Sequence, residues 1–310
     1  MLVHRAYRYE LDPNNSQRSS LLQHAGVFRF TYNWGLEQRI ALFKKNQGAA
    51  RFTDAMKQHK LLTSLKKTHF PWMYECSKCA PQEASRDLQR AFNNFCRGMK
   101  TGKRVGFPRF KKRGVNDSFR LYGTIRFEGQ KIKLPRIGKV RIKEKRKKYH
   151  DGKILSVTVR RRADRWFVSI SVEEEIPDPK PIEGKAVGVD LGIRTLATLS
   201  DGTIFLNPQA LGVRLNKLRK LSKNLSKKRS GSNNHEKDKL RLSKMHLKIF
   251  NIRQDALHKL TTYLAKNHST IVIEDLHVSG LMKNRRLARA IADVGMFEFR
   301  RQLRYKCRWY

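Results

Sequence analysis

The sequence predicts a multidomain chain that joins an α+β part to an α/β part, and three observations predict it. Apolar and polar residues alternate with a period of two over residues 119–175, which is typical of antiparallel strands. Apolar residues three and four positions apart over residues 14–100 indicate a helical block. Two apolar runs near residues 187 and 273 each end on an acid, with two long helical stripes between them.

The first part begins with an expected strand over residues 2–11, followed by a turn and a capped helix. Arg39 lies off the apolar stripe of this helix, so we expect it on a solvated basic face. A second helix is expected from Thr53 or Asp54 to about residue 67, and a third from Pro81. The apolar stripe of the first helix is Leu21, Ala25, Phe28, Tyr32, Leu36 and Ile40. The apolar stripe of the third helix is Ala84, Leu88, Ala91, Phe95 and Met99.

Cysteines are few in this chain. Cys76 and Cys79 form a single CxxC pair, but a structural zinc needs four ligands and the chain has no second pair. We therefore expect buried or half-buried thiols here. Four cysteines without a paired framework suit a reducing compartment.

A basic segment at residues 102–113 interleaves cations with two aromatic residues, a mixture that suits phosphate contacts and base stacking. The alternative is a basic loop in which the phenylalanines serve as anchors. A second basic cluster is expected to open a final helix that runs through Phe299 and Leu303. The nucleic-acid-binding candidates are Phe107, Arg109, Phe110, Lys111, Lys112 and Arg113, with Lys283, Arg285 and Arg286.

The antiparallel strands of residues 119–175 predict a small barrel with a basic outer face. The charged run 143–150 is expected to be a solvated loop. The proline-rich residues 176–181 indicate a stiff linker, where we place the main boundary.

The second part follows an order of strand, hairpin, long helices, strand and helix, which matches a ribonuclease-H-like fold. In that fold the first and fourth strands are parallel neighbours, so Asp190 and Glu274 would meet at one edge. Two such acids suit a pair of Mg²⁺ ions that bracket a phosphate. The alternative is that each acid is a helix cap or turn former. Asp275 would point to the opposite side and is not expected as a third ligand.

Charge sets the class of partner. The chain has 68 Lys and Arg against 26 Asp and Glu, a formal net charge of +42, which predicts salt-sensitive binding to RNA or DNA. Its apolar runs are too short for a spanning helix, and no signal peptide opens it. We therefore expect a cytoplasmic, nucleoid-associated protein without a membrane partner.

Several of these segments together resemble the TnpB family, transposon-encoded RNA-guided DNA nucleases also described as OrfB-type transposases of insertion sequences. The resemblance covers essentially the whole chain. It rests on Tyr9–Pro13 with Gly26, Arg29, Tyr32 and Asn33, on Gly106–Lys111 (GFPRFK), on Gly188–Ile193 and Ile273–Leu276 as the first two RuvC motifs, and on residues 284–288 and 302–306.

The resemblance implies a wedge-like β-barrel from residues 1–13 and 105–178, with an inserted helical recognition lobe at 14–104. Family members often carry a helix-turn-helix label at the N-terminal part of that lobe. A RuvC nuclease domain is implied for residues 185–310. The implied partners are a guide RNA from the transposon end and double-stranded target DNA, and the implied cofactor is Mg²⁺.

The family usually adds a zinc ribbon and a third RuvC motif that supplies the last catalytic Asp. These 310 residues contain neither, so we expect a truncated nuclease domain without zinc ligands. Whether such a chain is an enzyme is left open. One alternative is a cleavage-deficient RNA- and DNA-binding protein; another, a guide-free transposase, lacks any tyrosine or serine recombinase arrangement in the sequence.

Overall fold

A computed structural model describes residues 1–45, 54–102, 104–144, 152–179 and 186–310. The chain divides into two units, Met1–Ile176 and Pro177–Tyr310. Most of the charged run 143–150 and the end of the expected linker at 180–181 lie outside the described residues.

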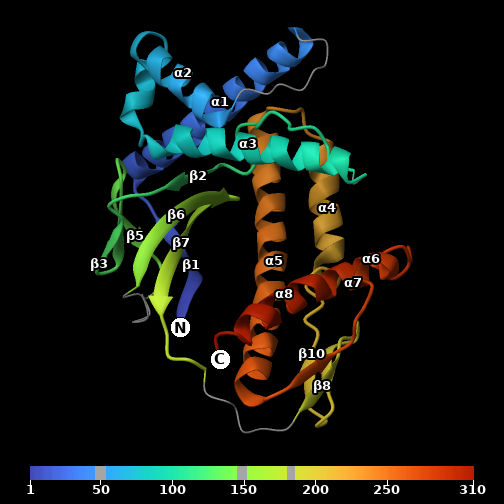
Figure 1. Cartoon of the computed structure of the whole chain (residues 1–310). Coiled ribbons are helices and arrows are strands. Elements are labelled where there is room, and N and C mark those ends of the chain that lie inside the picture. Colours follow the sequence, from blue (N-terminus) through green and yellow to red (C-terminus); the bar gives the residue numbers. More distant parts are fainter. Residues whose placement is uncertain (46–53, 103, 145–151, 180–185) are drawn as a thin grey trace. The chain divides into compact units, whose positions relative to one another are not determined.

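The first unit contains a seven-stranded antiparallel sheet in the order β2-β6-β7-β1-β5-β4-β3 (Figure 1). Its centre is the pairing of β1 with β7, which runs from Leu2 opposite Glu175 to Leu11 opposite Trp166. Among the described strands no ladder joins β2 to β3, so closure into a barrel stays a prediction. The strands are β1 (Leu2–Asp12), β2 (Ser118–Leu121), β3 (Arg126–Glu128), β4 (Lys131–Leu134), β5 (Gly138–Ile142), β6 (Lys153–Arg162) and β7 (Arg165–Glu175).

The helices of the first unit are α1 (Asn15–Lys45), α2 (Ala55–Thr68), the 3₁₀ helix η1 (Pro71–Glu75) and α3 (Cys79–Lys100). The stripe expected on α1 is confirmed, since Leu21 and Leu36 are fully buried in the core. Two expectations are wrong. Arg39 is completely buried, because Gln58 and Gln89 accept its hydrogen bonds at 2.8 Å and it lies over the Phe92 ring. On α3 the buried side runs through Phe92, and Met99 is exposed.

The second unit is built on a four-stranded sheet in the order β10-β9-β8-β11. Its strands are β8 (Val187–Asp190), β9 (Thr195–Leu199), β10 (Ile204–Leu206) and β11 (Ile271–Ile273). The 3₁₀ helix η2 (Gly212–Arg214), α4 (Leu215–Ser226) and α5 (Asn233–Asn267) connect β10 to β11, and α6 (Val278–Leu281), α7 (Ala288–Val294) and α8 (Met296–Lys306) follow. The core packs Val187 and Val189 against Leu257, Leu260 and Phe299.

The single helix expected from Lys283 is wrong. Residues 283–286 form a loop in which the Asn284 side chain accepts the backbone N–H of Arg286, and helices α7 and α8 are separated at Gly295. Gly295 adopts φ 77°, a left-handed conformation that ends α7, and Leu257 and Arg253 crowd the place of a Cβ atom there. No helix within the described residues has the length and apolarity needed to span a bilayer.

Candidate functional site

Asp190 and Glu274 come from neighbouring strands although 83 residues separate them in the sequence. Strands β8 and β11 pair in parallel, and Val189 lies opposite Ile273. Asp190 is the last residue of β8, and Glu274 directly follows β11. Adjacent strands lie about 5 Å apart, so the two acids follow the same edge of the sheet, as the sequence predicted for the first and fourth strands.

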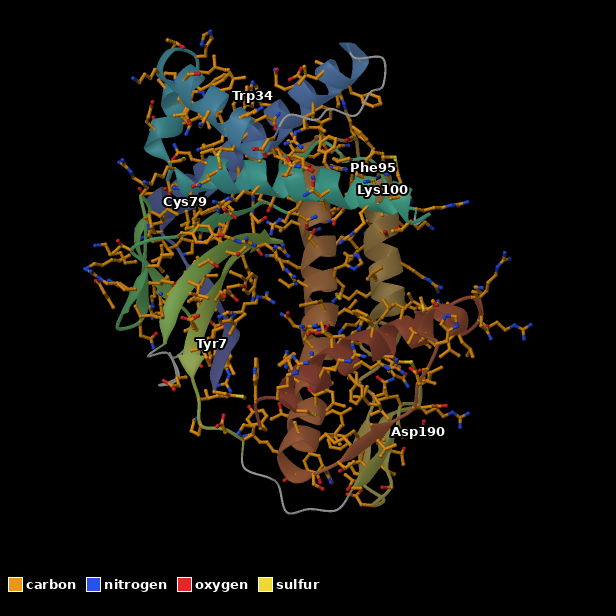
Figure 2. All side chains as sticks on the ribbon, in the orientation of Figure 1. Tyr7, Trp34, Cys79, Phe95, Lys100 and Asp190 are labelled. Atoms are coloured by element: carbon orange, nitrogen blue, oxygen red, sulfur yellow. The ribbon has the colours of Figure 1, made fainter. Side chains whose placement is uncertain are left out.

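The two acids also share one face of the sheet. Val187 and Val189 are buried in the core, so Gly188 and Asp190 face the other way. On β11, Ile273 packs against the same core whereas Val272 is 59% exposed, which turns Glu274 outward with Asp190. Figure 2 shows Asp190 near the end of this part of the sheet.

Neither carboxylate is neutralised by the protein. Both residues are exposed, and neither side chain has an ion pair or a hydrogen bond with another described residue. This is unusual in a chain with 68 Lys and Arg, where most other acids of the second unit, such as Asp293 and Glu298, contact an arginine or a lysine. Two free, adjacent carboxylates concentrate negative charge at the strand ends and are suited to a cation.

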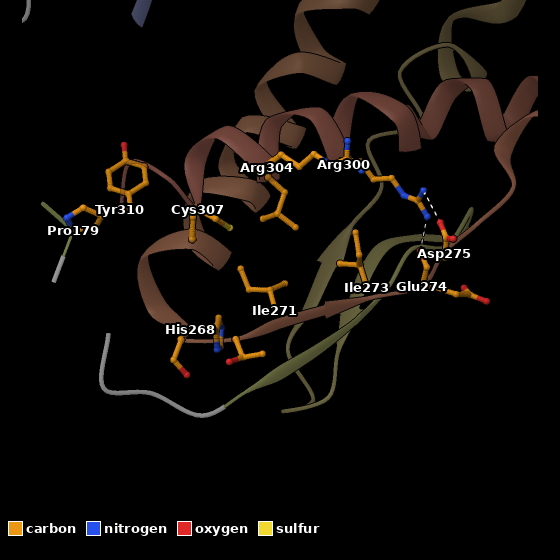
Figure 3. Close-up of a pocket in the computed structure, with 14 residues that line it drawn as sticks. Pro179, His268, Ile271, Ile273, Glu274, Asp275, Arg300, Arg304, Cys307 and Tyr310 are labelled. Carbon is orange, nitrogen blue, oxygen red and sulfur yellow. Dashed lines mark hydrogen bonds and ion pairs between the residues drawn. The ribbon is translucent and has the colours of Figure 1, made fainter. Parts of the chain in front are cut away.

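Arg300 of α8 holds the end of β11 in place, and no pattern in the sequence pointed to this residue. Its Nη2 donates to the backbone carbonyl of Glu274 at 2.7 Å, and its Nη1 pairs with the Asp275 carboxylate at 3.0 Å (Figure 3). The pairing turns Asp275 toward α8. Arg300 therefore fixes the backbone that carries Glu274 while leaving the Glu274 side chain free.

The glycine two residues after Asp190 has a steric reason. A Cβ atom at Gly192 would lie 3.0 Å from the Thr195 carbonyl oxygen and 3.2 Å from its hydroxyl. The close approach of Thr195 in the tight turn from β8 into β9 therefore favours a residue without a side chain. At the other end of β8, the Ser200 hydroxyl accepts the Gly188 N–H at 3.0 Å and stabilises the hairpin.

Carboxylate oxygens are the donors that Mg²⁺ prefers, so Asp190 and Glu274 fit such an ion by chemistry and by position. Within the described residues, no group of three or more His, Cys, Asp or Glu side chains gathers to hold a metal. The CxxC thiols are buried or half-buried, as expected: Cys76 is buried, Cys79 is partly buried, and burial raises the pKa of the Cys76 thiol to about 11.

The basic segment near residue 107 divides into anchored and exposed residues. The Phe107 ring makes edge contacts with Phe92 at 5.5 Å and Phe95 at 5.3 Å, so it packs on α3. The Lys111 ammonium lies 4.4 Å from the centre of the Tyr32 ring. Phe107 is still 39% exposed, and the other exposed members are Arg109, Lys112 and Arg113, with Phe110 51% exposed. In the second unit, Lys283, Arg285 and Arg286 are all exposed on the loop before α7.

Sequence comparisons identify close relatives over almost the whole chain. Residues 169–285 match the OrfB IS605 family, described as a probable transposase, and residues 1–48 match its helix-turn-helix domain. "Putative RNA-guided DNA endonuclease InsQ" of Escherichia coli K12 is 35% identical over 322 residues, covering 98% of this chain and 78% of that protein. A protein of Streptomyces pristinaespiralis with the same functional name is 36% identical over 313 residues, covering 99% and 76%.

The structural comparison is weaker. A Cas12f1 chain from a complex with single guide RNA and target DNA aligns with a TM-score of 0.47 at 13% identity, covering 94% of this chain and 71% of that one.

The helix-turn-helix match falls on β1 and the 31-residue helix α1. The described residues 1–45 contain one helix, without a turn inside it.

Proposed function

The chain belongs to the OrfB IS605, or TnpB, family of transposases, and we propose that it acts as a transposon-associated RNA-guided DNA endonuclease with Asp190 and Glu274 in its cutting site. The observation that carries the proposal is the parallel pairing of β8 and β11, which brings these free acids together on one face. The curated relatives are named RNA-guided DNA endonucleases, which supports the reaction class.

In this proposal Asp190 and Glu274 would hold Mg²⁺ at the edge of a RuvC-type, ribonuclease-H-like sheet. Mg²⁺ held there would supply the Lewis-acid chemistry that activates water and stabilises charge on a phosphate. Arg300 keeps the Glu274 backbone at the metal edge, and Gly192 accommodates the close approach of Thr195 in the turn after Asp190. The net charge of +42 supports a guide RNA, transcribed from the transposon end, and double-stranded DNA as partners.

The division of the remaining chain follows the same proposal. The sheet of the first unit serves as a wedge-like barrel, residues 14–104 as a recognition lobe, and residues 185–310 as the nuclease domain. The exposed cations Arg109, Lys112, Arg113, Lys283, Arg285 and Arg286, together with Phe110, contact nucleic acid. Phe107 and Lys111 support that surface through their packing on α3 and α1.

One observation favours a second candidate function. Only two acids converge within the described residues, and two-metal nucleases commonly use more. The alternative is therefore a protein that binds guide RNA and target DNA without cutting.

The test uses the full chain, purified with the RNA that copurifies from cells carrying its own locus. Mg²⁺-dependent cutting of a plasmid library is expected for the wild type and is lost in Asp190→Asn and in Glu274→Gln, because each variant removes a metal-binding charge. Asp255→Asn is the matched control, since Asp255 is an exposed acid of α5 paired with Lys259. Cutting that survives Asp190→Asn refutes the assignment; RNA-dependent target binding without cutting by the wild type selects the second function.

A further inference from the structure

We propose that a cavity of the first unit is a binding site for nucleic-acid phosphate, built around the buried side chain of Lys66. The cavity has a volume of about 960 Å³ and lies among α2, η1, the start of α3 and the β4–β5 hairpin. Four cations line it, namely Lys66, Lys78, Lys133 and Arg136, and no lining residue is acidic. The proposal deepens the proposed function, on which it rests for its choice of ligand.

Lys66 is the decisive residue. It is 7% exposed, faces the cavity from α2, and has no hydrogen-bond acceptor or carboxylate partner among the described residues. Burial lowers the pKa of its ammonium group. The ammonium group at the end of this mostly buried side chain has no counter-charge in the protein, and an anion bound in the cavity would supply one.

One buried acid close to the cavity is already engaged. Glu83 of α3 is buried, and it accepts hydrogen bonds from Arg86, Arg120 and Tyr122 at 2.7, 3.3 and 3.1 Å. Tyr122 itself lines the cavity. The Glu83 carboxylate is therefore paired with other residues and does not neutralise Lys66.

Lys133 on β4 adds to the positive charge. It lies opposite Arg126 on β3 and opposite Lys139 on β5, and like charges in directly opposite positions repel. Glu128 binds both neighbours, Arg126 at 2.8 Å and Lys139 at 2.7 Å. No carboxylate within the described part of the chain contacts Lys133, because Glu128 is paired with the two neighbouring cations.

The remaining wall is favourable to an anion as well. Cys79, labelled in Figure 2, begins the 22-residue helix α3 and lines the cavity, so the positive end of the helix dipole lies there. Lys78 and Arg136 are exposed at the rim, and Arg136 has φ 65° in the β4–β5 turn. A ligand with several phosphates in a row, RNA or DNA, would engage the buried and the rim cations together.

The experiment compares Lys66→Met with Lys67→Met in the full chain. Lys67 is the next residue of α2, is exposed and does not line the cavity. Two readouts are needed: urea unfolding of the protein freed of nucleic acid, and binding of labelled oligouridylate or duplex DNA across a salt series. The two ligands distinguish an RNA site from a DNA site, and neither readout requires cleavage.

Lys66→Met is expected to be at least as stable as the wild type without nucleic acid, because the ammonium group that it removes has no partner in the protein and methionine keeps the buried apolar part of the side chain. It is expected to bind at least one ligand about tenfold more weakly. The slope of log K against log salt should shrink by about 0.7 for the single strand or about 0.9 for the duplex. Lys67→Met should change these values far less.

Equal binding by Lys66→Met and Lys67→Met to both ligands overturns the proposal, as does a loss of stability in Lys66→Met with binding unchanged. If Lys66→Met does not fold, Arg136→Asn tests the same site, because asparagine tolerates a positive φ. Its binding must then weaken, with a smaller salt slope, for the proposal to stand. Loss of cutting in Asp190→Asn with normal binding would leave this site unaffected.

Discussion

A buried lysine in the second unit makes stability depend on pH in an unusual direction. Lys306 of α8 is 5% exposed, and its ammonium donates to the hydroxyls of Thr261 and Thr262 at 2.7 Å and to the His258 carbonyl at 2.9 Å. All of these acceptors are neutral. Burial lowers the pKa of Lys306 from 10.5 to about 8.

The direction follows from proton binding. Below pH 8 the lysine is charged in the folded and unfolded chain, so its contribution is constant. Between about pH 8 and 10.5 the unfolded chain keeps the proton and the folded chain has lost it, so stability rises with pH. At about 1.4 kcal/mol for each pH unit, the rise reaches about 3 kcal/mol at most.

The assay is urea unfolding, followed by far-UV circular dichroism, of the wild type, Lys306→Met and the exposed control Lys259→Met. Comparing variants cancels the titration of the other lysines. The wild type should gain up to about 3 kcal/mol relative to Lys306→Met between pH 7.5 and 10.5. A constant difference between these two proteins over that range would refute the reasoning, as would an equal change in Lys259→Met.

Three further changes test the second unit by the same urea assay. Asp293→Ala should lower the free energy of unfolding by about 3–5 kcal/mol, because Arg253, which donates to Asp293 at 2.7 Å, and two backbone N–H groups would lose their acceptor. The control Asp255→Ala should lower it by less than about 0.5 kcal/mol. A similar loss in both variants would contradict this prediction. Gly295→Ala should lower the free energy of unfolding by about 1–2 kcal/mol, because alanine is disfavoured at the positive φ of this position. An unchanged urea midpoint would contradict this prediction. Ser232→Ala should cost about 1 kcal/mol by removing the N-cap of α5, whereas Ser230→Ala serves as the control and should have little effect.

The sequence predicted the elements whose patterns are local. The stripe of α1 and the alternation along β7 follow from helical and strand periodicity, and the structure confirms both. For the candidate site, an apolar run ending on Asp190 and another ending on Glu274 were visible as strands, and their parallel pairing is confirmed. Their roles as metal ligands stay a prediction.

Other features depended on partners far away in the sequence. Arg39 is polar by its pattern, yet Gln58 and Gln89 from two other helices allow its burial. Arg300 contacts the end of β11 from 26 residues away, and no spacing rule links them. Lys66 has an exposed neighbour at Lys67, and only the packing of α2 against η1 and α3 distinguishes the two lysines.

The parallel ladder of β8 and β11 determines which segments of the protein can accept insertions or deletions. Val189 faces Ile273, so a single-residue insertion or deletion within either strand would rotate one acid into the apolar interior and separate it from the other. The turn at residues 227–232, between α4 and α5, carries no such constraint, because the ladder depends on where the two strands meet and not on the path between them. Homologues should therefore differ in length at that helical turn while keeping both strands free of gaps.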